Sequence, residues 1–279
     1  MKEDYKFKID PKDLPPLTEE QKAYPYSDLY YRDIAEPCQA VKDKFAPNNY
    51  LDPSKAIMPE DFTKFTDPDF VPEMGYCKLP NGAGYSCTVV DLPEGNMEMF
   101  DYRLKLVFSE DMGFIVEYPG FHFKHFDGVC VEDSYDGPKA LILDRNYSAY
   151  ELGFTDLPTN INPKLLGFCG HEQDFVSAEG PIDPTRGKGA LFLITKKLDK
   201  GIQHIWIVYY GLHVCNGKAE VVLGDGEVIE AEQCRRAGLH LAYESVNQVQ
   251  YLPILMERYP DREFAPAKPW PDRLLFLKH

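Results

Sequence analysis

Residues 190–210 read ALFLITKKLDKGIQHIWIVYY, and this stretch decides the fold class. Two runs of β-branched and aromatic residues flank the turn L-D-K-G at 198–201, a pattern typical of a β-hairpin. The second run continues to Val214. Its period of two places four side chains on one face of the strand: His204, Trp206, Val208 and Tyr210. The sequence therefore predicts two long antiparallel strands, one of which carries a histidine among aromatic and aliphatic neighbours.

Further strands and one long helix are expected on either side of this hairpin. Upstream strands are expected at 84–90 (GYSCTVV), 102–108 (YRLKLVF), 113–118 (GFIVEY) and 139–144 (KALILD). Downstream, a last strand at Ala219–Leu223 precedes the turn G-D-G-E and a helix from about Glu230 to Tyr259, which Pro253 should kink or shorten. Antiparallel strands followed by a long C-terminal helix describe an α+β fold in which a curved sheet grips a helix and leaves a cavity between them.

The chain before this region has a different character. Nine prolines lie in the first 70 residues, which excludes long helices and strands there. Short helices still fit, with Thr18 as one N-cap. Aromatic side chains in the same region favour burial over disorder. We expect residues 1–80 to form a proline-rich, partly helical segment packed on a larger domain at 81–279.

Composition narrows the classes of partner. The formal net charge of -15 leaves no basic face for nucleic acid or for an anionic membrane. Seven dispersed cysteines without a C-x-x-C motif indicate reduced thiols, and the first ten residues, MKEDYKFKID, lack the apolar stretch of a secretory signal. A cytoplasmic protein is therefore expected. Aromatic residues reach 13%, which suits both a thick core and a site that encloses a flat ligand.

The stretch GLHLAYE at 238–244 raises the possibility of a metal site. His240 and Glu244 are four residues apart, so they share one face of the expected helix. They are either metal ligands or a hydrogen-bonded polar pair facing water.

Further donors for a metal would have to come from other segments. YPGFHFKHF at 118–126 offers His122 or His125 at a strand end, and only one of the two can face inward because their separation is odd. Glu151 follows a tyrosine-rich stretch, whereas GHE at 170–172 reads as an exposed loop. Mixed imidazole and carboxylate donors favour Zn²⁺ over iron or manganese.

His204 is the other candidate for chemistry. A histidine that faces a cavity among aromatic side chains can serve as a general acid or base. The alternative is an inward-facing histidine whose hydrogen bonds are satisfied and which has no chemical role.

Four segments carry a resemblance to a known family. They are NGAGYSCTVVDLPEGNMEMFD at 81–101, YPGFH at 118–122, ELG at 151–153 and HLAYESVNQVQYLP at 240–253. In this order, across about residues 80–260, they resemble the 2,4-diacetylphloroglucinol hydrolase and phloretin hydrolase family. The chain departs from that family after MEMFD, where tryptophans and a histidine give way to YRLKLVF, so the ring and the acyl group of the substrate stay open.

The resemblance implies a zinc-dependent hydrolase that cleaves the C–C bond between an acyl group and a phloroglucinol-type ring. It also implies a helix-grip, birch-allergen-like domain, a small aromatic ketone as substrate and a homo-oligomer, either dimer or tetramer. The implied zinc ligands are His122, Glu151, His240 and Glu244. The implied catalytic residues are His204 and a tyrosine, Tyr210 or Tyr209, and the expected substrate contacts are Tyr118, Trp206 and Tyr209.

Two other functions fit the same pattern. A non-catalytic protein of this fold could bind a hydrophobic ligand without metal, and intact ligand after incubation would identify it. A metal-dependent lyase or decarboxylase could act on another aromatic compound, and its products would distinguish it from a hydrolase.

Overall fold

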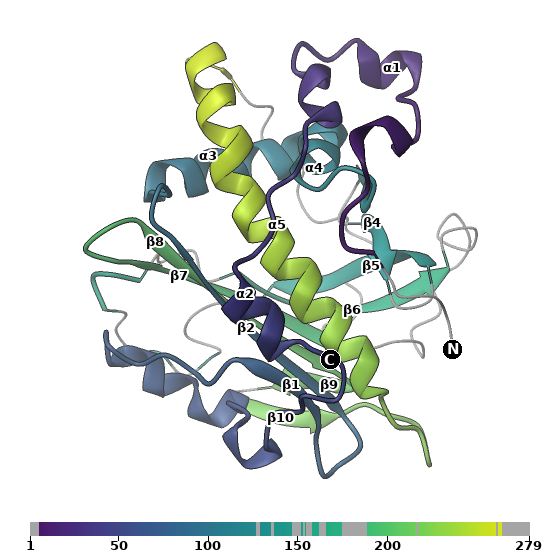
Figure 1. The fold of residues 1–279 in the computed structure, drawn as a ribbon. Coiled ribbons are helices and arrows are strands. Elements are labelled where there is room, and N and C mark those ends of the chain that lie inside the picture. The colour runs from purple at the N-terminus through teal and green to yellow at the C-terminus, as the bar shows by residue number, and fades with distance from the viewer. Residues whose placement is uncertain are drawn as a thin grey trace.

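A computed structural model describes residues 6–126, 129–134, 137–146, 152, 154, 158–161, 166–174, 189–215, 217–260 and 262–263 (Figure 1). The α-helices are α1 (Glu19–Lys22), α2 (Gln39–Lys44), α3 (Met97–Ser109), α4 (Asp111–Glu117) and α5 (Ala231–Arg258). Short 3-10 helices are η1 (Pro11–Asp13), η2 (Ser27–Tyr31), η3 (Pro53–Lys55) and η4 (Pro59–Thr66). The strands are β1 (Gly75–Lys78), β2 (Gly84–Leu92), β3 (His122–Phe126), β4 (Val129–Ser134), β5 (Gly137–Asn146), β6 (Leu166–Asp174), β7 (Gly189–Lys197), β8 (Ile202–Tyr210), β9 (Leu212–Cys215) and β10 (Lys218–Val221).

The main sheet is antiparallel, and α5 lies across one of its faces (Figure 1). Its strand order is β1-β2-β8-β7-β6-β5-β4-β3, and β9 and β10 form a separate pair. The expected hairpin is confirmed, because β7 and β8 pair with Thr195 opposite His204. On its other side β8 pairs with β2, which sets Val90 opposite His204. The α+β class with a long C-terminal helix is therefore confirmed.

The two faces of β8 pack against different parts of the chain. Trp206 and Val208 belong to a core shared with Leu239 and Ala242 of α5. Ile205, Ile207 and Tyr209 belong to a second core on the opposite face. That second core is completed by Phe62 and Phe65 from η4. The expected alternation along the strand is thus confirmed, and the face carrying His204 is the one that meets α5.

The N-terminal segment packs against the rest of the molecule through short helices. Thr18 caps α1 in a reciprocal capping box with Gln21, as its position predicted. Tyr26 and Tyr30 share a core with residues of α4 and α5. The sheet begins with β1, inside the segment that the sequence assigned to the N-terminal region, since β1 pairs with β2.

Polar contacts tie the same segment to α5 over long sequence separations. Asn247 Oδ1 accepts from the backbone nitrogen of Ala35 at 3.1 Å. Asp28 pairs with Arg258 at 2.8 Å near the end of the helix. These contacts join residues more than 200 positions apart and hold the segment along α5.

Two expected strands are helices instead, and this corrects the sequence interpretation. Residues 102–108 lie in α3, and residues 113–118 lie mostly in α4. The side chain of Asn96 caps α3 by accepting from the backbone nitrogen of Met99 at 2.8 Å. The buried positions of α3, among them Phe100, Arg103, Leu104 and Val107, recur at spacings of three and four, which is a helical period. A continuous apolar run hid this period, because such a run fits a buried strand equally well.

Three smaller expectations are also corrected. His122 begins β3 directly after the turn that follows α4, whereas a strand end was expected. Residues 170–172 lie within β6 and not in a loop. β8 ends at Tyr210, because Gly211 adopts a φ of +75° that breaks the run toward Val214.

Among the described helices, none has both the length and the apolar character that crossing a membrane requires. The four cysteines whose side chains are described, Cys38, Cys77, Cys87 and Cys234, are free thiols.

Candidate metal centre

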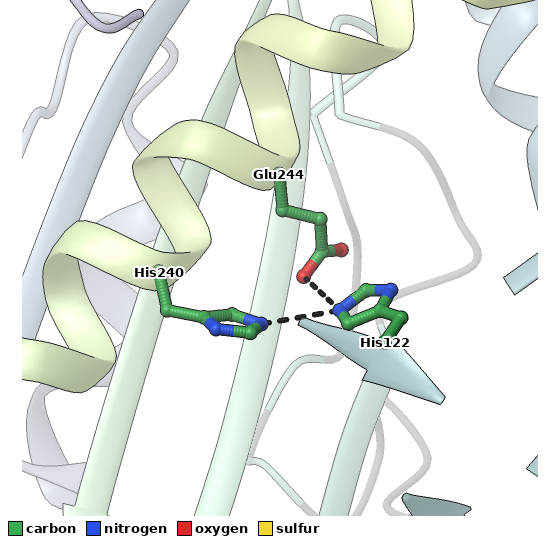
Figure 2. Close-up of side chains that lie close together, drawn as sticks. All are labelled: His122, His240 and Glu244. Carbon is green, nitrogen blue, oxygen red and sulfur yellow. Dashed lines mark hydrogen bonds and ion pairs between the residues drawn. The ribbon is translucent and has the colours of Figure 1, made fainter. Parts of the chain in front are cut away.

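Three buried side chains from two distant segments converge between α5 and the start of β3 (Figure 2). His240 and Glu244 project from one face of α5, and His122 comes from the first residue of β3. Each residue offers one donor atom, and these three atoms lie within 4.8 Å of one another. Their exposed fractions are 1% for His122, 7% for His240 and 5% for Glu244. The helix pair therefore does not face water, which was the alternative reading of this stretch.

The ring of His122 is fixed in one orientation and one tautomer. Its Nδ1 lies 3.0 Å from the carbonyl oxygen of Phe114. Because a carbonyl oxygen can only accept, Nδ1 carries a proton, and in the neutral ring Nε2 keeps a lone pair. The ring also stacks on the ring of Phe114, with centroids 3.8 Å apart and planes 7° apart. Histidines that bind metals usually donate the N–H of one ring nitrogen to a carbonyl or similar acceptor and offer the other nitrogen to the metal.

The two histidines face each other through nitrogen atoms. His122 Nε2 lies 3.1 Å from His240 Nε2. Two nitrogens held about 2.0–2.1 Å from a tetrahedral zinc ion would lie about 3.3 Å apart, close to this spacing. Burial lowers the pKa of His240 to about 3, so its ring is neutral at pH 7 and can donate a lone pair.

Glu244 completes the described part of the site. One of its carboxylate oxygens, Oε2, lies 3.9 Å from His122 Nε2 (Figure 2). The residues present fit a metal ion, since two imidazoles and a carboxylate converge in a buried position. The buried triad of His122, His240 and Glu244 can thus hold a metal ion.

A buried ionic network lies directly behind Glu244. Arg103 of α3 contacts Glu244 through Nη2 and Glu117 of α4 through Nε, the latter at 2.5 Å. Burial raises the pKa of Glu117, and the adjacent guanidinium of Arg103 opposes that rise. Sequence reasoning missed both residues because their segments were assigned to strands. The available signal was a charged residue inside each of two apolar runs, at positions where burial requires a partner.

His204 lies on the same face of the sheet, beneath α5. Burial, reinforced by the positive charge of Arg103, lowers its pKa to about 3. Trp206 Nε1 donates to the hydroxyl oxygen of Ser245 at 2.8 Å, and His204 Nδ1 lies 3.3 Å from the same oxygen. With one donor already received, Ser245 is free to donate its own proton to His204 Nδ1.

One tautomer of His204 that this contact allows leaves a donor free. If Nδ1 accepts from Ser245, the proton of the neutral ring resides on Nε2. That Nε2 is buried and has no hydrogen-bond partner in the described part of the chain. A buried donor without a partner is rare in proteins, and it is available to a bound molecule.

The remaining predicted site residues fall in different places. Tyr118 is buried beside the triad, with its ring centre 4.8 Å from that of His240, and its hydroxyl donates to the Phe7 carbonyl at 2.7 Å. Trp206 lies on the face of His204. Tyr210 shares this face but is six residues further along the strand than His204, about 20 Å from it.

Tyr209 lies on the opposite face, where its hydroxyl donates to the carbonyl of Ile57 at 2.5 Å. Tyr209 therefore lies on the face of β8 away from α5, and Tyr210 is the last residue of that strand. Glu151 lies outside the described residues, as does the side chain of His125.

Comparison of the chain with protein-family models finds no match, and comparison with curated proteins finds none. The function is therefore inferred from the site itself and from the motifs that surround its residues.

Proposed function

We propose that this protein is a zinc-dependent hydrolase that cleaves the C–C bond between an acyl group and a phloroglucinol-type ring. The observation that carries the proposal is the convergence of His122, His240 and Glu244, three of the four ligands that the resemblance implies. Glu151 is proposed as the fourth. The antiparallel sheet with α5 across one face supports the proposed helix-grip arrangement.

The chemistry of the bond explains why such a site suits this substrate class. An aryl ketone resists hydrolysis because its ring would have to leave as an aryl carbanion. A polyhydroxylated ring avoids this by adopting a keto tautomer, so that the ring leaves as a stabilised enolate. Zinc, when bound, supplies Lewis acidity and activates water near neutral pH. Water then provides the hydroxyl of the acid product and, overall, the proton that the ring carbon gains.

His204 is proposed to bind the ring oxygen on which charge develops. We expected a proton shuttle at this position, but a pKa of about 3 makes the imidazolium form costly at neutral pH. A neutral ring with its proton on Nε2 can instead donate a hydrogen bond to the oxygen of the departing enolate. This role needs no net proton transfer by His204. Ser245 supports this role by donating to Nδ1, which keeps the proton of His204 on Nε2.

A serine substitution tests this role. Ser245→Ala removes the hydroxyl that fixes His204 and leaves Trp206 Nε1 without its acceptor. We expect turnover to fall by about tenfold or more, and the free energy of unfolding to fall by about 1–3 kcal/mol. Ser86→Ala is the matched control: Ser86 is buried on β2, and its hydroxyl has no partner among the described residues. Equal turnover in the two variants would contradict the role of Ser245.

Metal analysis and product analysis test the proposed function together. Purified protein is assayed for zinc and incubated with phloretin and with 2,4-diacetylphloroglucinol in water enriched in ¹⁸O. We expect about one zinc per chain, a free phenol, and a carboxylic acid that carries the label. Glu244→Ala should lose both zinc and turnover, whereas Glu257→Ala, an exposed substitution on the same helix, should lose neither.

The other outcomes are separable. Zinc with both substrates left intact, or with products other than an acid and a phenol, would favour a lyase or decarboxylase that acts on another aromatic compound. Intact substrate and no zinc, even after zinc is supplied, would overturn the proposal. In that case His122 and His240 share a proton and not a metal, and the protein is a metal-free binder.

A further inference from the structure

Arg103 is a charged residue in the interior of the protein, where a charge must be paired to be stable. Only 5% of the residue is exposed, and its guanidinium lies between two carboxylates. Toward Glu117 it forms a two-point contact, with Nε 2.5 Å from Oε1 and Nη2 3.2 Å from Oε2. Toward Glu244 it forms one contact, from Nη2 to Oε1. Its central carbon lies 5.9 Å from the ring centre of Trp206, which closes a further side.

The contact with Glu244 divides the two oxygens of that carboxylate between different partners. Oε1 accepts from Arg103, while Oε2 is the oxygen that approaches His122 Nε2 (Figure 2). A carboxylate with one oxygen bound in this way offers a metal the other oxygen alone. It is also restrained from rotating about its last side-chain bond.

We propose that Arg103 is the positioning residue for Glu244 and that Glu117 in turn holds Arg103. The proposal rests on the metal centre described above. It goes beyond the resemblance, because Arg103 lies in the stretch YRLKLVF, where this chain departs from the related family.

Three features of α3 and α4 support this assignment. Glu117 Oε1 and Oε2 both accept from Arg103, so the carboxylate neutralises the guanidinium and fixes its plane. The end of α4 is itself fixed, since Arg32 donates to the carbonyls of Val116 and Glu117 at 2.5 and 3.1 Å. The same helix supplies the Phe114 carbonyl that orients His122. Two consecutive helices thus orient one ligand from β3 and one from α5.

The shape of the arginine side chain is needed for this role. Its planar group presents donors in fixed directions, so it can contact two carboxylates at once with defined geometry. A lysine would keep the charge but would act as a point charge on a flexible stem. Arg103→Lys should therefore loosen Glu244 without removing the positive charge. Partners of metal ligands commonly change metal affinity by about 10–100-fold when they are replaced.

The test measures metal binding and not turnover. Zinc dissociation constants are determined by competition with a chromophoric chelator for wild type, Arg103→Lys and Glu117→Gln. The visible absorption of the Co²⁺-substituted proteins reports the ligand geometry. Arg262→Lys is the matched control, since Arg262 also pairs with a carboxylate, Glu110, at 2.6 and 2.7 Å. We expect about tenfold weaker zinc binding or more, and an altered Co²⁺ spectrum, in the two site variants only.

A double variant shows whether weaker zinc binding is caused by a loss of folding. Arg103→Met with Glu117→Gln removes one cation and one anion together, so the net charge of the interior is unchanged. It should retain a cooperative urea transition and still bind zinc more weakly than wild type.

Site variants that bind zinc as tightly as wild type would overturn the inference. Tighter binding would overturn it and also identify Arg103 as a competitor of the metal. A wild-type protein that binds no zinc would overturn the metal centre as well. The two failures are therefore distinguishable.

Discussion

At the scale of single residues, burial decides what each histidine of the site can do. His204 and His240 are both buried, and each has a pKa lowered to about 3. A neutral imidazole has one lone pair and one proton. His240 can use the lone pair toward a metal, whereas His204, when it accepts from Ser245, keeps the proton on Nε2 for a ligand. Two histidines of equal charge state thus present opposite hydrogen-bonding groups.

The buried state of His204 makes stability depend on pH. Its pKa is about 3 in the folded protein and about 6.5 in the unfolded chain, so between these values only the unfolded chain binds the proton. The contribution of His204 to the free energy of unfolding is therefore fully present above pH 6.5, and it decreases as the pH falls toward 3. At pH 5 the loss is about 2 kcal/mol.

Urea unfolding at pH 7 and pH 5 checks this prediction. The loss of unfolding free energy between the two pH values should be smaller in His204→Gln than in wild type by about 2 kcal/mol. The other ionisable groups are present in both proteins and cancel in the comparison. Equal losses would mean that folding does not lower the pKa of His204.

At the scale of elements, the most informative region is the pair of helices α3 and α4. The hairpin of β7 and β8, the long helix α5 and the inward face of β8 followed from periodicity, because each is long and strongly patterned. Residues 102–108 and 113–118 did not, because a short apolar run has the same composition in a buried strand and in a buried helix.

The same limit explains which parts of the site could be predicted. His122, His240 and Glu244 were predictable from their motifs. Arg103 and Glu117 were not, since their role depends on where two helices pack in the folded molecule. The faces of Tyr209 and Tyr210 followed from alternation along the strand.

The packing of α5 on β2 leads to a second prediction, at Gly238. An alanine in a helix interior is usually more favourable than glycine by about 1 kcal/mol. Here a Cβ atom would collide with the ring of Phe45 and lie 2.5 Å from Ser86 Oγ. Gly238→Ala should therefore lower the free energy of unfolding by about 1–3 kcal/mol.

Urea unfolding of Gly238→Ala measures the effect. Glu257→Ala, an exposed alanine substitution on the same helix, is the control. The control should change stability by less than about 0.5 kcal/mol. Zinc affinity should also weaken in Gly238→Ala, because His240 is two residues further on. A stabilised variant would show that α5 can move away from β2 without cost.

At the scale of the whole molecule, a metal in this site would join β3 to α5 across more than 100 residues of chain. An ion that binds only the folded state stabilises it by about 2.7 kcal/mol at a free concentration 100 times its dissociation constant. For a chain of this size we expect the thermal midpoint to rise by roughly 5–10 °C with zinc. A chelator should reverse the rise.

Thermal scans of wild type and His240→Gln, each with zinc and with chelator, provide the measurement. The variant should show the same midpoint in both conditions, since it lacks one ligand. An equal rise in both proteins would place the stabilising ion elsewhere.

The contacts between the N-terminal segment and α5 can form only late in translation. Ala35 is synthesised 212 residues before its partner Asn247. At about 5–20 residues per second, a ribosome needs roughly 10–40 s to produce that partner. Throughout this interval Tyr26 and Tyr30 lack the part of their core that α5 supplies. We expect the nascent chain to engage ribosome-associated chaperones for longer than a chain of equal length whose contacts are local.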